Sequence, residues 1–117
     1  MWLVLFDDAG VGMDEVAAAL KAARLEFHLK GDTIVVHDDV NVTITLEQAG
    51  WIAEESAEMA AGHPEAERIG RCSLRLELTW ADSDSAEVTS TLGMIEPALR
   101  TVLRPMWVFD AAAGAFV

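Results

Sequence analysis

Carboxylates are the most unusual chemical feature of this 117-residue sequence. Between Gly31 and Glu67 there are nine acidic residues and no lysine or arginine. The rest of the chain holds the other 11 acids and all 8 bases, so most of the net charge of -12 belongs to this one segment. A surface of this kind favours a basic partner, because complementary charges steer association. The nine acids are Asp32, Asp38, Asp39, Glu47, Glu54, Glu55, Glu58, Glu65 and Glu67.

A predicted helix over residues 47–61 places a tryptophan among these carboxylates. At about 100° per residue, the small and apolar residues share one buried face: Ala49, Ile52, Ala53, Ser56, Met59 and Ala60. Trp51 lies on the opposite face with four glutamates, Glu47, Glu54, Glu55 and Glu58. An outward tryptophan is typical of a protein-binding anchor. The alternative is that Trp51 folds back under the 38–46 hairpin and that the glutamates are merely solvated.

We therefore predict a partner-binding site on this segment and no catalytic or metal site. Its residues are Trp51, Glu47, Glu54, Glu55, Glu58, Asp38 and Asp39. The expected partner is a basic, toxin-like protein, which the site would bind at a rate that falls with salt. Trp51→Ala should then weaken binding by roughly 2 kcal/mol or more.

Other candidate chemistry has an ordinary structural explanation. Five aspartates follow strands that we expect to run parallel, where they would share one sheet edge and could bind Mg²⁺: Asp7, Asp8, Asp82, Asp84 and Asp110. Ordinary strand-end turns and helix caps also explain these aspartates, and we favour that explanation over a metal site. The histidines form no metal motif, Cys72 has no cysteine partner, and Gly10-Val-Gly12 lacks the lysine of a phosphate loop.

Hydropathy patterns indicate the elements that must position these residues. Apolar stripes predict helices over 13–24, 47–61 and 85–104, and alternation predicts strands over 2–6, 25–30, 33–37, 40–46, 71–80 and 107–110. A short edge segment follows at 115–117. Thr45 to Gln48 has the pattern of a capping box for the second helix. Pro97 predicts a kink, or a break near Glu96, in the third.

This order, βα-βββ-α-β-α-β, predicts a single α+β domain over residues 1–117. We expect a two-layer sandwich, a ferredoxin-like variant, with the helices on one face of a mixed sheet. The strand–helix–strand units at either end should be right-handed parallel crossovers. The strand over 71–80 alternates, so that Cys72 faces inward and Arg75 faces water.

Composition excludes several classes of function. The chain is 52% hydrophobic and 24% charged, which is typical of a folded globular domain. The negative charge argues against nucleic acid and against an anionic membrane surface. No run approaches the roughly 20 apolar residues of a membrane span. The opening hexapeptide lacks the basic residues of a signal peptide, so we expect a cytoplasmic protein without a cofactor.

In size, acidity and its exposed-Trp helix, the chain resembles small acidic α+β proteins that serve bacteria as toxin-immunity proteins. The ending FDAAAGAFV is similar to the strand–turn–strand ending of many small bacterial proteins. The resemblance implies an inhibitor that occludes the basic active cleft of a toxin with the 31–67 face. The alternative hypothesis is a small-ligand-sensing or regulatory domain that forms a homodimer through an open sheet face. An Mg²⁺-dependent enzyme is the least favoured hypothesis.

Overall fold

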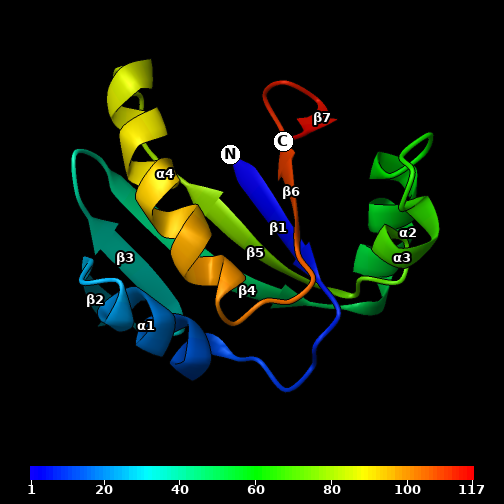
Figure 1. Cartoon of the computed structure of the whole chain (residues 1–117), viewed down its shortest axis with the longest axis horizontal. Coiled ribbons are helices and arrows are strands. Elements are labelled where there is room, and N and C mark those ends of the chain that lie inside the picture. Colours follow the sequence, from blue (N-terminus) through cyan, green and yellow to red (C-terminus); the bar gives the residue numbers. More distant parts are fainter.

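The computed structural model describes all 117 residues as an α+β fold with one seven-stranded antiparallel sheet and four helices (Figure 1). The strands are β1 (Trp2–Phe6), β2 (Glu26–Lys30), β3 (Thr33–His37), β4 (Asn41–Gln48), β5 (Leu74–Thr79), β6 (Trp107–Asp110) and β7 (Ala115–Phe116). The helices are α1 (Met13–Ala22), α2 (Gly50–Met59), α3 (Ala66–Ile69) and α4 (Ser85–Arg100). The α+β class is therefore confirmed.

The strand order is β2-β3-β4-β5-β1-β6-β7, and every neighbouring pair is antiparallel. The predicted mixed sheet is therefore wrong. Strands β5 and β6 do run in the same direction, but β1 lies between them and hydrogen-bonds to both. Strand β1 is apolar on both faces because it has a hydrogen-bonded neighbour on each side and side chains packed above and below.

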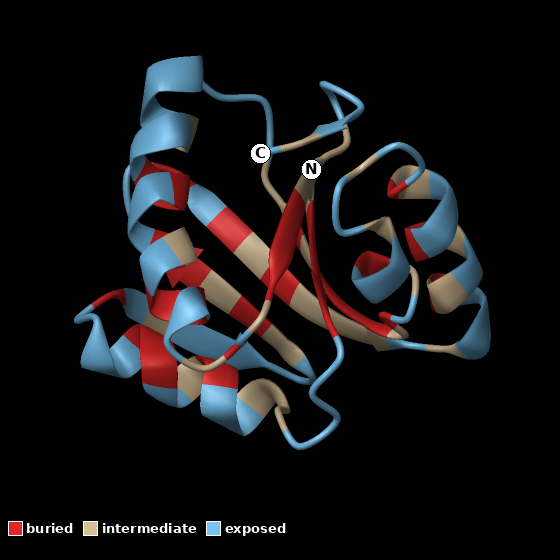
Figure 2. Ribbon diagram, turned by 45° about the vertical axis from the view of Figure 1, so that its right-hand side comes forward, coloured by how far each residue is buried: buried red, intermediate tan, exposed pale blue.

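Helices cover both faces of the sheet, in contrast to the prediction of one covered face. Helices α1 and α4 pack on the face that carries Val4, Leu76 and Val108, and this is the main core. Helices α2 and α3 lie against the other face at one end, over a smaller cluster around Leu5 and Trp107. Figure 2 shows buried residues along the central strands and along the inner sides of the helices. With seven strands and helices on two faces, the ferredoxin-like order is not confirmed.

The structure corrects two local expectations, one of them in full and the other in part. The predicted capping box lies inside β4, where Thr45 pairs with Glu77 and Gln48 pairs with Leu74, so α2 begins later, after Ala49. Helix α4 continues through Pro97 to Arg100, so the break expected near Glu96 is absent, while a kink at Pro97 stays a prediction. Its buried stripe of Leu92, Ile95 and Leu99 packs in the main core and supports the helix on both sides of the proline.

The antiparallel sheet also separates the strand-end aspartates. Asp7 and Asp8 follow the C-terminal end of β1. Because β5 and β6 run antiparallel to β1, Asp82, Asp84 and Asp110 lie at the opposite ends of the strands. No group of three or more histidine, cysteine or acidic side chains comes close enough to hold a metal ion. None of the four helices combines the length and the hydropathy needed to cross a membrane.

Candidate protein-binding site

Helix α2 holds Trp51 at its surface because the opposite side of the helix is anchored to the sheet. Ile52 and Ser56 are buried, and the Ser56 hydroxyl donates a hydrogen bond to the Cys72 carbonyl at 3.0 Å. The helix ends after Met59, and Gly62 adopts a φ of +84° in the turn that follows, a conformation that favours glycine. The buried face predicted for this helix is therefore confirmed at Ile52 and Ser56.

Trp51 lies on top of a buried arginine that the sequence had assigned to the wet face of the sheet. The guanidinium carbon of Arg75 is 5.0 Å from the centroid of the indole ring, within the range of a cation–π contact. The Arg75 side chain is only 7% exposed, whereas Trp51 keeps 50% of its surface exposed. The alternative in which Trp51 folds back under the 38–46 hairpin is therefore not what the fold adopts.

Two of the predicted site glutamates bind Arg75 instead of facing outward freely. Arg75 Nε donates to Glu47 Oε1 at 3.2 Å, and Arg75 Nη1 donates to Glu55 Oε1 at 2.7 Å. Burial alone would lower the pKa of Arg75, but the hydrogen bonds and charges of Glu55 and Glu47 outweigh burial and raise it. Glu47 and Glu55 therefore pair with Arg75 within the chain, and their role toward a binding partner stays a prediction.

A third glutamate, Glu77 on β5, joins this cluster. Its pKa is raised, first by a hydrogen bond with Glu47, then by burial and by the negative charge of Glu47, and Arg75 opposes the rise. Two carboxylates thus bind the guanidinium beneath the indole, and the charge of Arg75 also acts on Glu77. No cavity lies at this point of the surface, so the cluster offers no enclosed site for a substrate.

Glu54 and Glu58 are the predicted site residues that remain exposed on α2 without a basic partner. They are one helical turn apart, where two like charges cost a few tenths of a kcal/mol, about 0.2–0.5. Further along the chain, Glu65 pairs with Arg68 and Glu67 pairs with Arg71. The strongest uncompensated negative charge beside Trp51 therefore belongs to Glu54 and Glu58.

Asp38 and Asp39 do not join this site. They lie in the turn between β3 and β4, and the Asp38 carboxylate accepts a hydrogen bond from the Thr91 hydroxyl of α4 at 3.0 Å. The eight residues of β4, roughly 25 Å of extended strand, separate this turn from α2. The 31–67 segment is therefore not one continuous acidic face, because its hairpin tip packs toward α4 and its helix lies on the opposite face of the sheet.

Sequence reasoning missed the central role of Arg75. Charge counted along the chain cannot show a pairing across strands, and Arg75 lies opposite Glu47 only once β4 and β5 are in register. That register also affects the predicted dimer face. Arg75 is already covered by Trp51 within one chain, so the open sheet face expected for a homodimer does not include Arg75.

The remaining reactive side chains have structural surroundings. Cys72 is fully buried, as predicted, in the smaller cluster beneath α3, and burial is the chief cause that raises its pKa to about 11. His28 and His37 stack on neighbouring strands, and His63 accepts a hydrogen bond from the Glu65 backbone. Comparison with known proteins adds no assignment, because no family model, no curated protein and no solved structure matches this chain.

Proposed function

We propose that this chain is a protein-binding module that recognises a basic partner through the exposed surface of α2. The proposed contact surface consists of Trp51, Glu54 and Glu58. It is smaller than the seven-residue site expected from the sequence, because Glu47 and Glu55 hold Arg75, while Asp38 and Asp39 lie elsewhere. The observation that carries the proposal is a half-exposed indole that is fixed from below.

Fixing the indole reduces the cost of binding. Immobilising a flexible side chain at an interface costs about 0.5–1.5 kcal/mol. The lower side of the Trp51 ring already stacks on Arg75, and Arg75 is itself held by Glu47 and Glu55. The exposed half of the ring is therefore presented in one orientation, as is typical of residues that dominate the energy of an interface.

Charge determines the kind of partner. Glu54 and Glu58 follow Trp51 by one and two helical turns and have no lysine or arginine to neutralise them, and the whole chain carries a net charge of -12. Such a field attracts a basic protein and repels nucleic acid and anionic membranes. In its finer form, the proposal is an immunity-type inhibitor that occludes the active cleft of a basic, toxin-like protein. It includes no catalytic role for the chain.

Affinity capture with matched variants tests this proposal. The wild-type chain is immobilised beside Trp51→Ala, the double variant Glu54→Gln/Glu58→Gln, and the control Glu67→Gln, which changes another exposed carboxylate, one that pairs with Arg71. We expect one basic protein to be retained by the wild type and the control and to be lost by both test variants. Equal retention by all four chains, or retention of acidic proteins only, would refute the proposal.

A further inference from the structure

A cavity of about 480 Å³ lies between the first turns of α4 and the neighbouring ends of β1, β5 and β6, on the sheet face opposite α2. This volume falls within the range of small-molecule sites. Two indole rings line it, together with apolar and hydroxyl side chains of α4 and one carboxylate. The lining residues on which the argument depends are Trp2, Trp80, Val88, Thr89, Leu92 and Asp110.

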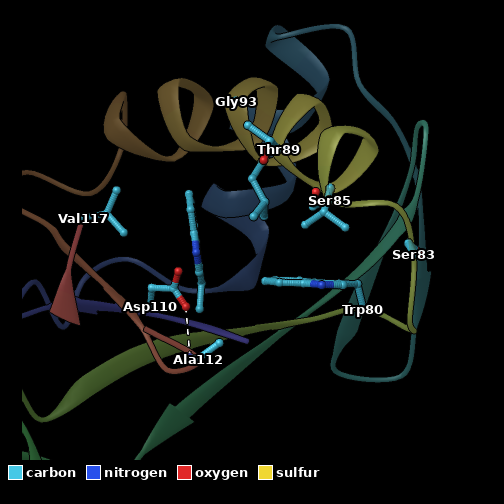
Figure 3. Close-up of a pocket in the computed structure, with 11 residues that line it drawn as sticks. Trp80, Ser83, Ser85, Thr89, Gly93, Asp110, Ala112 and Val117 are labelled. Carbon is cyan, nitrogen blue, oxygen red and sulfur yellow. Dashed lines mark hydrogen bonds between the residues drawn. The ribbon is translucent and has the colours of Figure 1, made fainter. Parts of the chain in front are cut away.

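The sheet brings the two tryptophans and the aspartate together from distant parts of the chain. Trp2 begins β1 and lies directly opposite Asp110, the last residue of β6. On its other side Trp2 pairs with Leu78 of β5, and Trp80 follows two residues later on the same face. Figure 3 shows Trp80 lying flat below Thr89 and Ser85 of α4, with Asp110 on the neighbouring wall.

Asp110 is the only ionisable side chain among the lining residues. Its Oδ1 accepts hydrogen bonds from the backbone N–H groups of Ala112 at 3.0 Å and Ala113 at 3.2 Å. Its Oδ2 has no hydrogen-bond or ion-pair partner within the protein. One carboxylate oxygen therefore remains free for a positively charged group, and no lysine or arginine competes for it.

The indole rings favour the same charge. The faces of tryptophan rings attract ammonium groups, and aromatic cages that bind such groups use this attraction. Trp107 donates its indole N–H to Glu65, whereas neither Trp2 nor Trp80 forms a side-chain hydrogen bond. The N-terminus of α4, where the helix dipole is positive, also borders the cavity. It does not reverse the preference for a cation, because the Asp84 carboxylate caps it by accepting a hydrogen bond from the Ala86 N–H at 2.8 Å.

We propose that this cavity binds a small organic cation, with an ammonium head between the indoles of Trp2 and Trp80 and facing Asp110. Val88 and Leu92 would contact its apolar part. The inference is independent of the proposed function, since the cavity and α2 lie on opposite faces of the sheet. A neutral sugar could also stack on an indole, but it would gain little from a free carboxylate.

Choline and its uncharged isostere 3,3-dimethylbutan-1-ol distinguish charge from shape, and glucose represents the sugar alternative. Each compound is titrated into the wild-type chain while backbone amide shifts are recorded by NMR. We expect choline alone to shift the amides of Ser83, Thr89 and Ala112 in a saturable way. Equal binding of the isostere, saturation by glucose only, or no saturable binding of choline would overturn the proposal.

Variants then place the ligand in the cavity. Asp110→Asn keeps an oxygen acceptor for the turn but removes the charge, and we expect it to weaken choline binding about tenfold. The matched control Asp82→Asn removes a nearby exposed charge outside the lining and should change the affinity by less than about twofold. Trp80→Leu should abolish the shifts while the thermal unfolding curve shows a folded chain. Unchanged affinity in Asp110→Asn and Trp80→Leu would contradict the assignment.

Discussion

Replacing Arg75 by methionine removes the only buried charged side chain of the protein while largely keeping its volume. The change breaks hydrogen bonds to Glu47 and Glu55 and removes the cation beneath Trp51. Glu47 and Glu77 would then repel each other without a neutralising guanidinium. We therefore expect Arg75→Met to lower the free energy of unfolding substantially.

The magnitude follows from the contacts. A charge-assisted hydrogen bond contributes about 1.5–3 kcal/mol, and the lower value applies here because Glu47 and Glu55 are 25% and 42% exposed. The stacking on Trp51 adds about 0.5–1 kcal/mol. Burial of the apolar methionine side chain recovers about 1 kcal/mol, which leaves a net loss of about 3 kcal/mol.

Urea denaturation followed by circular dichroism measures this loss. With a slope of about 2 kcal/mol per molar urea, the midpoint should fall by about 1.5 M. The matched control is Arg71→Met, because Arg71 pairs with Glu67 at 2.8 Å but is 67% exposed. An exposed pair of this kind contributes less than about 0.5 kcal/mol. If both variants lose the same small amount, Arg75 does not organise the surface beneath Trp51, and the reasoning is wrong.

Three further predictions concern neighbouring groups. Because the pKa of Glu77 is raised in the folded chain, ionisation of this group costs stability as the pH rises through the glutamate range. Glu77→Gln should therefore stabilise the fold by roughly 0.5 kcal/mol near neutral pH and give no gain in stability below about pH 4. Urea unfolding at both pH values measures the difference, and an equal gain at both would contradict the assignment. Burial raises the pKa of Cys72 to about 11, so the folded chain should resist a thiol reagent at about pH 8 and react only at the rate of unfolding. Immediate labelling would show instead that the thiol is accessible. Trp51→Ala should cost less than about 1 kcal/mol of folding stability, so a much larger loss in thermal or urea unfolding would make Trp51 a structural residue instead of a binding anchor.

Short-range patterns in the sequence predicted several elements to the residue. The strands Trp2–Phe6, Thr33–His37 and Trp107–Asp110 were predicted with the observed bounds, because each is a compact apolar or alternating run between turn residues. The buried stripe of α4 was also predicted, since an uninterrupted helical spacing leaves one interpretation. Local patterning is sufficient where local and tertiary preferences agree.

Features that depend on pairing between distant strands were not predictable in this way. The capping-box pattern at Thr45 lies inside β4, whose residues pair with β5. The strands that α1 and α4 connect run in the same direction, as predicted, but other strands lie between them, so no parallel pair forms. The short helix α3 carries too few residues for a periodic signal. The alternation of residues 25–30 does not show that Leu29 is 62% exposed, because only the strand order makes β2 an edge strand.

The candidate site also combines features that a local pattern predicts with features that depend on pairing between distant strands. Exposure of Trp51 and the isolation of Glu54 and Glu58 follow from the periodicity of one helix. The roles of Glu47 and Glu55 depend instead on Arg75, which lies 20 residues beyond Glu55. Only the register of the sheet brings these groups together, so the sequence overstated the free acidic surface.

The affinity of a captured basic partner, measured by calorimetry for the wild-type chain and for Trp51→Ala at low and at high salt, tests the protein-binding proposal most directly. We expect the substitution to weaken binding by about 2 kcal/mol or more, close to a 30-fold rise in Kd, and we expect salt to weaken the wild-type complex. The same Kd for both chains, or an affinity that salt leaves unchanged, would contradict the role assigned to Trp51 and its flanking glutamates.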